Sequence, residues 1–216
     1  MKVLVIAAHP DDEILGCGGA LLKHKEAGDI IDVCIVTRAN DSKWSGEYKE
    51  NKIKEANEVD SILGTNKRYY ADFPSVKLNT IDSLTFNSKI GEIINESNPD
   101  LIYTHHESDI NIDHRIIFDS VMVNTRPIEK RISVICFETL SSTEWNNKSF
   151  IPNYYITINK NHLDGKIEMF SKYKSEVKQF PHPRSFKGIE VLASKRGMDI
   201  CYDYAEAFCV ARSYWI

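Results

Sequence analysis

The sequence lacks the features that mark several broad classes of protein. It has no C-x-x-C pair, and its five cysteines are an odd number spread widely over 216 residues. We therefore expect reduced thiols that serve as small core residues, not a disulfide framework or a cysteine-rich zinc site. No apolar run reaches the roughly 18 residues that a membrane span requires, so none is expected.

An excess of basic residues is also missing. Lys and Arg together number 27 and Asp and Glu 31, which gives a formal net charge of -4. Because nucleic-acid binding needs a basic face to neutralise phosphates, we expect no nucleic-acid partner. The apolar run from Val3 to Ala8 is too short for the core of a signal peptide, so a cytoplasmic protein is expected.

The chain does contain a regular alternation of apolar strands and amphipathic helices, the latter ending at Gly or Pro. Strands are predicted at residues 2–8, 30–36, 67–70, 101–104, 132–137 and 154–158. Helices are predicted at 14–27, 48–63, 82–96, 114–124, 163–173 and 185–196. This order predicts one α/β domain over residues 1–216, with a Rossmann-like, doubly wound, mostly parallel sheet and helices on both faces.

A cluster of ionisable residues follows the first predicted strand. The turn His9-Pro-Asp-Asp-Glu13 places one imidazole and three carboxylates at the carboxyl end of that strand, where doubly wound sheets bind ligands. Capping of the next helix by Asp11 or Asp12 would explain one acid, but not three acids beside a histidine. The cluster therefore favours a metal site.

A dinucleotide site is the rival use of such a turn, and Gly16, Gly18 and Gly19 lie close by. These glycines fall inside the predicted helix, however, and the turn carries acids where a pyrophosphate needs bare N–H groups. An oxidoreductase is therefore disfavoured, and close packing of the helix on the sheet explains the glycines.

A second polar cluster runs from His105 to Arg115, where every residue except two isoleucines can ligate, ionise or hydrogen-bond. A solvated loop that caps the next helix through Asp113 is the alternative interpretation. Because this segment also follows a strand, His114 can join His9 and Asp12 around one ion.

These motifs resemble those of the PIG-L/LmbE family of zinc-dependent N-acetylglucosaminyl de-N-acetylases. The family hallmark A-H-P-D-D-E stands at residues 8–13, and an Asp-His pair after the fourth strand stands at 113–114. The resemblance implies zinc ligands at His9, Asp12 and His114, and a general base at Asp11.

The chemistry of the residues agrees with that implication. Two imidazoles and a carboxylate leave a coordination position open for water, and they suit Zn²⁺ or Fe²⁺. We expect hydrolysis of the acetamide of a small N-acetylated amino sugar, a GlcNAc-like group of a glycoconjugate or of a nucleotide or polysaccharide precursor. The alternative is a non-catalytic carbohydrate-binding protein on the same fold, which would not need the base. A homo-oligomer is compatible with the sequence.

Many family members carry a histidine three residues before the last metal ligand, where this sequence has Asn111. Asparagine can donate a hydrogen bond to an oxyanion but cannot act as an acid. The proton for the departing amine must then come from His106, from Asp11 or from His182, and we favour His182 because two prolines flank it.

Substrate contacts are expected from Arg184, Arg196 and Asp113. Residues 180–185 resemble a downstream stretch of family members, although an ordinary proline-rich turn is the alternative. Either arginine can hold a phosphate or a carboxylate through paired hydrogen bonds. The polar residues 40–46 after the second strand are expected to form a lid.

Overall fold

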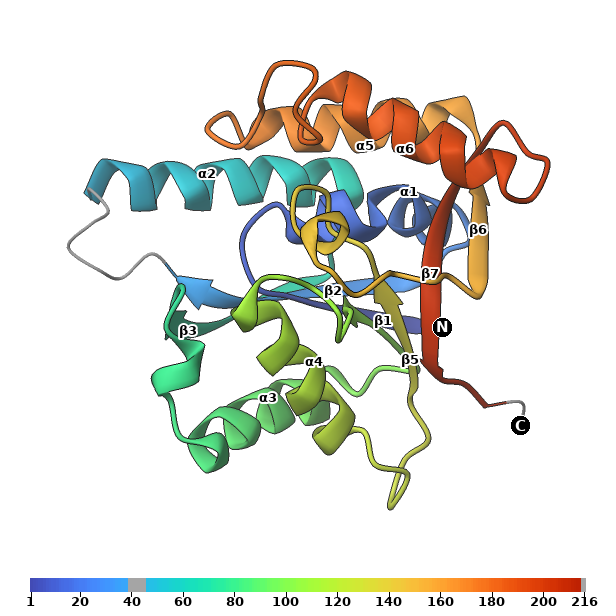
Figure 1. Ribbon diagram of the computed structural model, residues 1–216. Helices are drawn as coiled ribbons and strands as arrows, with labels where there is room; N and C mark the ends of the chain where they lie inside the picture. The colour runs from blue at the N-terminus through green and yellow to red at the C-terminus, as the bar shows by residue number, and fades with distance from the viewer. Residues whose placement is uncertain (39–45, 215–216) are drawn as a thin grey trace.

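The computed structural model describes residues 1–38 and 46–214, and within them one sheet has the strand order β3-β2-β1-β4-β5-β7-β6 (Figure 1). The strands are β1 (Lys2–Ala7), β2 (Ile30–Arg38), β3 (Lys67–Pro74), β4 (Leu101–His105), β5 (Ser133–Phe137), β6 (Tyr154–Ile158) and β7 (Tyr204–Arg212). The α-helices are α1 (Asp12–Glu26), α2 (Gly46–Leu63), α3 (Ser83–Ser97), α4 (Ile112–Asn124), α5 (Lys160–Lys172) and α6 (Phe186–Met198). Short 3-10 helices are η1 (Leu78–Thr80) and η2 (Thr143–Trp145).

The sheet is mostly parallel, which confirms the predicted fold class. Strands β1 to β5 pair in parallel, whereas β7 runs antiparallel to both β5 and β6. The chain reverses its direction of winding between the neighbouring strands β1 and β4, which is the switch point where such sheets bind ligands. Each predicted helix and strand is present with ends that differ by a few residues, but β7 was not predicted.

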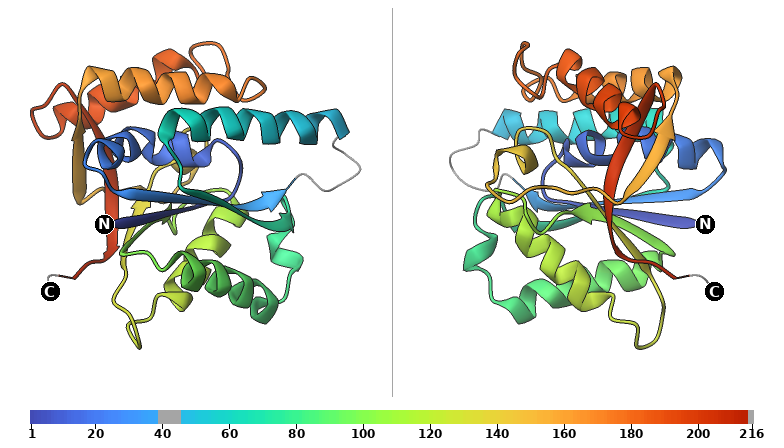
Figure 2. Two further views of the ribbon diagram at one scale, coloured as in Figure 1. Left: turned by 180° about the vertical axis from the view of Figure 1, so that it is seen from behind. Right: turned by 45° about the vertical axis from the view of Figure 1, so that its right-hand side comes forward.

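Helices cover both faces of the sheet, as the views in Figures 1 and 2 agree. Val3 and Val5 of β1 belong to the core that α1, α2, α5 and α6 cover. Leu4 and Ile6 belong to the other core, beneath α3 and α4. Successive side chains of a strand point to opposite faces, so a run that is apolar throughout suits a strand buried on both sides.

Close packing of α1 on the sheet accounts for two of its glycines, as predicted. A Cβ added to Gly16 would lie 2.2 Å from the ring of Phe137, and one added to Gly19 would lie 2.9 Å from Ile158. Side chains at these positions would push α1 away from β5 and β6, and with it the turn that precedes the helix.

The cysteines correct one expectation. Cys17, Cys34 and Cys136 are buried core residues, but Cys201 is exposed and Cys209 is partly exposed. The prediction that all five serve as core residues is therefore wrong for the last two. Cys201 lies in the turn after α6, with a φ of 58°, and Cys209 lies on β7. Among the described residues, no helix is long and apolar enough to cross a membrane.

Helix α1 is kinked at Cys17, whose φ of -144° is not helical. The kink leaves backbone groups on either side to find other partners. The Lys166 ammonium donates to the carbonyl of Leu15 at 2.8 Å. The carboxylate of Glu206 accepts the N–H groups of Gly19 at 2.9 Å and of Ala20 at 2.7 Å. Lys166 and Glu206 also form an ion pair at 2.6 Å. One buried ion pair thus binds the backbone groups on both sides of the kink in α1.

We expect Lys166→Met to lower the free energy of unfolding by about 3–5 kcal/mol, because it leaves the buried Glu206 carboxylate without its cation. Urea unfolding followed by circular dichroism measures the change. Lys160→Met is the matched control, since Lys160 lies on the same helix but pairs with Asp164 at the exposed surface. Equal unfolding midpoints for the two variants would contradict the role given to Lys166.

Candidate active site

The turn between β1 and α1 begins the site at the switch point of the sheet. Asp11 occupies the N-cap position of α1, yet its side chain makes no capping hydrogen bond. Its φ of 131° and ψ of -30° lie in a region that non-glycine residues rarely adopt, at a cost of roughly 1–3 kcal/mol. Helix capping therefore does not explain the acids of this turn, and the strain points to a functional role.

Three donor atoms meet where this turn faces the start of α4. Nδ1 of His9 lies 3.1 Å from Oδ2 of Asp12 and 3.5 Å from Nε2 of His114, which itself lies 3.3 Å from that oxygen. Ligand atoms about 2.1 Å from a tetrahedral zinc ion are about 3.4 Å apart. Asp12 and His114 are buried, and Oδ1 of Asp12 has no hydrogen-bond partner. The three residues fit three corners of a metal site.

In each histidine of this set, the ring nitrogen that faces away from the other donor atoms lies near a carboxylate. Nε2 of His9 lies 3.6 Å from Oδ2 of Asp113, and Nδ1 of His114 lies 3.1 Å from Oδ2 of Asp109. Such a carboxylate holds the ring proton on its own side and leaves the opposite nitrogen free to bind a metal, an arrangement common around histidine ligands.

The electrostatics of the set favour positive charge. Burial favours neutral His9, but the carboxylates of Asp113 and Asp12 outweigh it and raise the pKa of His9 to about 10. Burial also favours the neutral form of Asp12, but His114 and His9 outweigh it and hold the pKa of Asp12 well below its usual range. A cation among these residues meets charges already arranged to receive it.

A second possible set is formed by His105, Asp109 and His114, whose donor atoms also lie within 4.8 Å of one another. Nε2 of His105 accepts the N–H of Ala8 at 2.9 Å, however, and the ring stacks on His114 at 3.7 Å. Burial, followed by the charge of His114, lowers the pKa of His105 well below its usual range. His105 is thus a neutral support for the turn and for His114.

Asp11 lies beside the metal-ligand set, and Arg184 pairs with it. Nη1 of Arg184 donates to Oδ2 of Asp11 at 2.9 Å. Burial and the adjacent charge of Asp12 raise the pKa of Asp11 well above its usual range, although Arg184 acts in the opposite direction. A buried carboxylate with this raised affinity for protons is suited to take a proton from water.

Asn111 and Asp113 lie at the start of α4. Asn111, not Asp113, caps this helix, because Oδ1 of Asn111 accepts the N–H of Asp113 at 2.9 Å. The buried Asp113 carboxylate accepts the N–H groups of Val76 at 2.6 Å and Leu78 at 3.2 Å. Asp113 thus orients His9, and the contact with substrate expected of it stays a prediction.

The two candidate proton donors have similar contacts. Nδ1 of His182 accepts the N–H of Arg184 at 3.1 Å, and its ring meets that of Trp145 edge to face. Nδ1 of His106 lies 2.7 Å from the hydroxyl of Ser108. Burial lowers the pKa of His106. Each ring thus has Nδ1 in a local contact, so Nε2 is the atom from which a proton would leave.

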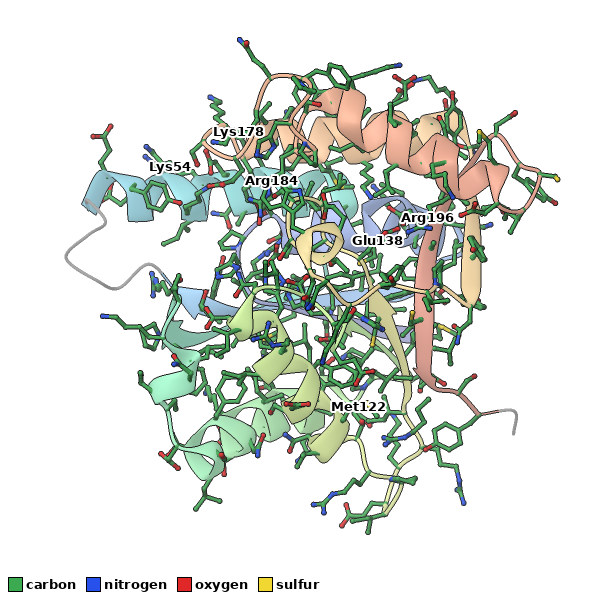
Figure 3. The ribbon with its side chains drawn as sticks, in the orientation of Figure 1. Lys54, Met122, Glu138, Lys178, Arg184 and Arg196 are labelled. Carbon is green, nitrogen blue, oxygen red and sulfur yellow. The ribbon has the colours of Figure 1, made fainter. Side chains whose placement is uncertain are left out.

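The two arginines are placed differently (Figure 3). Arg196 forms a paired salt bridge with Glu138, at 2.7 and 2.6 Å, and these two lie together near β7. Arg184 lies apart from them and lines a cavity beside His9 and Asp11. Its contacts with Asp11 and Glu176 make it part of the site, whereas the expected substrate contact of Arg196 would require it to leave Glu138.

A cavity of about 300 Å³ opens beside His9 and Asp11. Its polar end includes Asn111, Arg184 and Glu176, and its walls come from the ends of β2 and β3 and from α2. The wall residues are Pro10, Thr37, Arg38, Tyr48, Lys52, Ile53, Ala56, Tyr70, Ser75 and Val76. Gly46 begins α2, and residues 40–45 of the expected lid lie outside the described residues.

Four contributors to the site were given no individual role from the sequence: His105, Asp109, Glu13 and Glu176. The first two lie within the polar cluster at 105–115, so the signal was the cluster itself. Asp109 is held by the hydroxyls of Ser142 and Thr143, which no local pattern reveals. Glu176 joins Lys52 to Arg184 across the cavity.

Comparison with known proteins agrees with this geometry. The sequence profile of the family described as "PIG-L: GlcNAc-PI de-N-acetylase" matches residues 4–124, more than half of the chain. The chain belongs to this de-N-acetylase family. The matched span contains the donor atoms of His9, Asp12 and His114 and the carboxylate of Asp11.

Relatives and solved structures extend the likeness to most of the chain. The uncharacterized deacetylase YaiS of Escherichia coli (strain K12) is 27% identical over 178 residues, which cover 80% of this chain and 90% of YaiS. N,N'-diacetylchitobiose deacetylase from Pyrococcus horikoshii has a TM-score of 0.76 at 20% identity, covering 97% of this chain and 83% of that one. GalB, a 4-carboxy-2-hydroxymuconate hydratase from Pseudomonas putida KT2440, has a TM-score of 0.79 at 17% identity, covering 100% and 98%. A protein named for a different reaction thus has a similar fold.

We expect the purified protein to hold about one divalent ion per chain, because three donor atoms lie at the spacing of metal ligands. Asp12→Ala should lose the ion, and Asp109→Ala and Asp113→Ala should weaken its binding about 10- to 100-fold by releasing the histidines. Elemental mass spectrometry and competition with a chelating dye measure these effects. The control is Asp164→Ala, an exposed aspartate on α5. Wild-type protein without stoichiometric metal, prepared free of chelators, would refute the site.

Proposed function

We propose that this protein is a zinc-dependent hydrolase that removes the acetyl group from an N-acetylated amino sugar. The observation that carries the proposal is the placing of Asp11 next to a His-Asp-His set of tetrahedral spacing, at the polar end of a cavity. The deacetylase family and the chitobiose-deacetylating neighbour support the reaction and a GlcNAc-like substrate. Iron as Fe²⁺ suits the same ligands.

The metal, when bound, supplies an acidified water and a Lewis acid for the amide carbonyl. His9, Asp12 and His114 would hold it, and Asp113 and Asp109 orient the two rings. Because Asp12 carries the single negative charge among the three ligands, a divalent ion and these ligands would together carry a net positive charge, as sites that activate water do.

Asp11 takes the proton of the attacking water while the water oxygen adds to the acetamide carbon. Oδ1 of Asn111 is engaged by the N–H of Asp113, so its amide N–H groups are the part that can donate to the developing oxyanion. The carbon–nitrogen bond then breaks as the nitrogen receives a proton, giving acetate and a free amine. The donor is His182, His106 or Asp11 returning the proton it took.

A purely carbohydrate-binding role is less well supported. The unusual backbone of Asp11 costs free energy, and its carboxylate is buried beside another acid. Sugar binding requires neither feature, whereas proton transfer from water uses both.

We expect Asp11→Asn to keep its metal and to lose about a hundredfold or more in turnover, the usual contribution of a general base. Acetate release from a panel of N-acetyl sugars, with metal content measured on the same samples, tests this. Asp12→Ala is the comparison, because it should lose both metal and turnover. Normal turnover by metal-loaded Asp11→Asn would exclude the mechanism.

The proton donor can be identified by leaving-group dependence. An anilide needs little protonation to depart, so loss of the donor should slow an alkyl acetamide strongly and an acetanilide much less. We expect His182→Ala, with metal retained, to show this pattern. The same pattern in His106→Ala alone would move the role to His106, and its absence from both variants would leave Asp11 as base and acid.

A further inference from the structure

The backbone at Asp11 is held in an unusual conformation by contacts on both sides. Its φ is 131°, where L-residues are rarely found. Its carbonyl accepts the N–H groups of Ile14 at 3.0 Å and Leu15 at 2.9 Å, which begins α1. The backbone of Asp11 cannot return to a common conformation without moving the start of α1. The N–H of Asp11 therefore needs a partner that is fixed in this conformation.

Glu13 supplies that partner. Its Oε2 accepts the N–H of Asp11 at 2.9 Å, and the side chain is fully buried. Its Oε1 accepts the hydroxyl of Tyr173 at 2.6 Å and lies 3.3 Å from Nη1 of Arg68. A buried carboxylate with donors on both oxygens cannot change its rotamer freely, so it fixes the peptide that it contacts.

These donors come from elements far apart in the sequence. Tyr173 is the C-cap residue of α5, and Arg68 lies on β3. Arg68 is held by a paired contact with Asp60 of α2, at 2.8 and 2.7 Å. Residues of α5 and β3 thus contact Glu13, two residues after Asp11, and α2 holds Arg68 in place.

We propose that Glu13 and Tyr173 are positioning residues that hold the backbone of Asp11, and so its carboxylate, in the geometry needed for proton transfer. The inference rests on the proposed function for its effect on turnover. Displacing a catalytic group by about 1 Å can cost about a hundredfold in rate, so a support without contact to substrate can govern kcat.

Tyr173→Phe tests the proposal, with Tyr103→Phe as the matched control. Both tyrosine side chains are buried, and each hydroxyl makes one side-chain contact: that of Tyr173 with Glu13 is buried, and that of Tyr103 with Nε2 of His24, at 3.0 Å, is partly buried. Both variants should bind metal and show a similar fall in the midpoint of urea unfolding. Tyr173→Phe should lower kcat at least about tenfold with KM unchanged, whereas Tyr103→Phe should keep the wild-type kcat.

Hydrogen exchange of the Asp11 amide gives a readout that needs no turnover. We expect about tenfold faster exchange in Tyr173→Phe and no change in Tyr103→Phe. Glu13→Gln keeps an oxygen that accepts this N–H, so it should retain more protection and activity than Glu13→Ala. Equal exchange in the two tyrosine variants would overturn the inference. A wild-type protein that releases no acetate would instead overturn the proposed function, and the exchange result would still decide the role of Tyr173.

Discussion

Repulsion among buried carboxylates is the constraint that shapes this site. Five of them are at most 2% exposed: Asp11, Asp12, Glu13, Asp109 and Asp113. Removing such charges from water is costly unless each finds donors or a cation. Asp113 receives two backbone N–H groups, Asp109 two hydroxyls, and Asp11 a guanidinium. Two imidazoles converge on Oδ2 of Asp12, while Oδ1 of the same carboxylate has no hydrogen-bond partner.

The same constraint explains why neighbouring acids in one turn have different roles. Asp12 points between the histidines, Asp11 pairs with Arg184, and Glu13 accepts the backbone N–H of Asp11. Each direction is set by partners from a different part of the chain. Three like charges in sequence therefore have three different surroundings, which suit the proposed roles of ligand, base and support.

Much of the fold and the central part of the site follow from sequence because their signals are local. Apolar runs and helix ends predict the parallel strands, and parallel strands bring His9 and the loop before His114 to one edge. Strand β7 escaped prediction because the charged Glu206 interrupts its apolar pattern. That residue is buried only because Lys166 and the kink of α1 give it partners.

Residue type alone does not fix the roles of residues in the outer part of the site. Arginine and aspartate near a catalytic motif suggest contacts with substrate, and Arg184 and Asp113 were interpreted so. In the structure Arg184 pairs with Asp11, and Asp113 lies behind His9. Whether a charged side chain faces a ligand or another residue depends on long-range packing, which no spacing in the sequence records.

The family match ends at residue 124, yet the later part of the chain contacts Asp11 and Glu13 of the N-terminal motif and the helix that follows them. Tyr173 fixes Glu13, Arg184 pairs with Asp11, and Glu206 binds the break in α1. Most of the other residues that line the cavity come from α2 and the ends of β2 and β3. A change in these residues alters which molecule fits without moving His9, Asp12 or His114, which gives a physical reason why one fold serves different substrates.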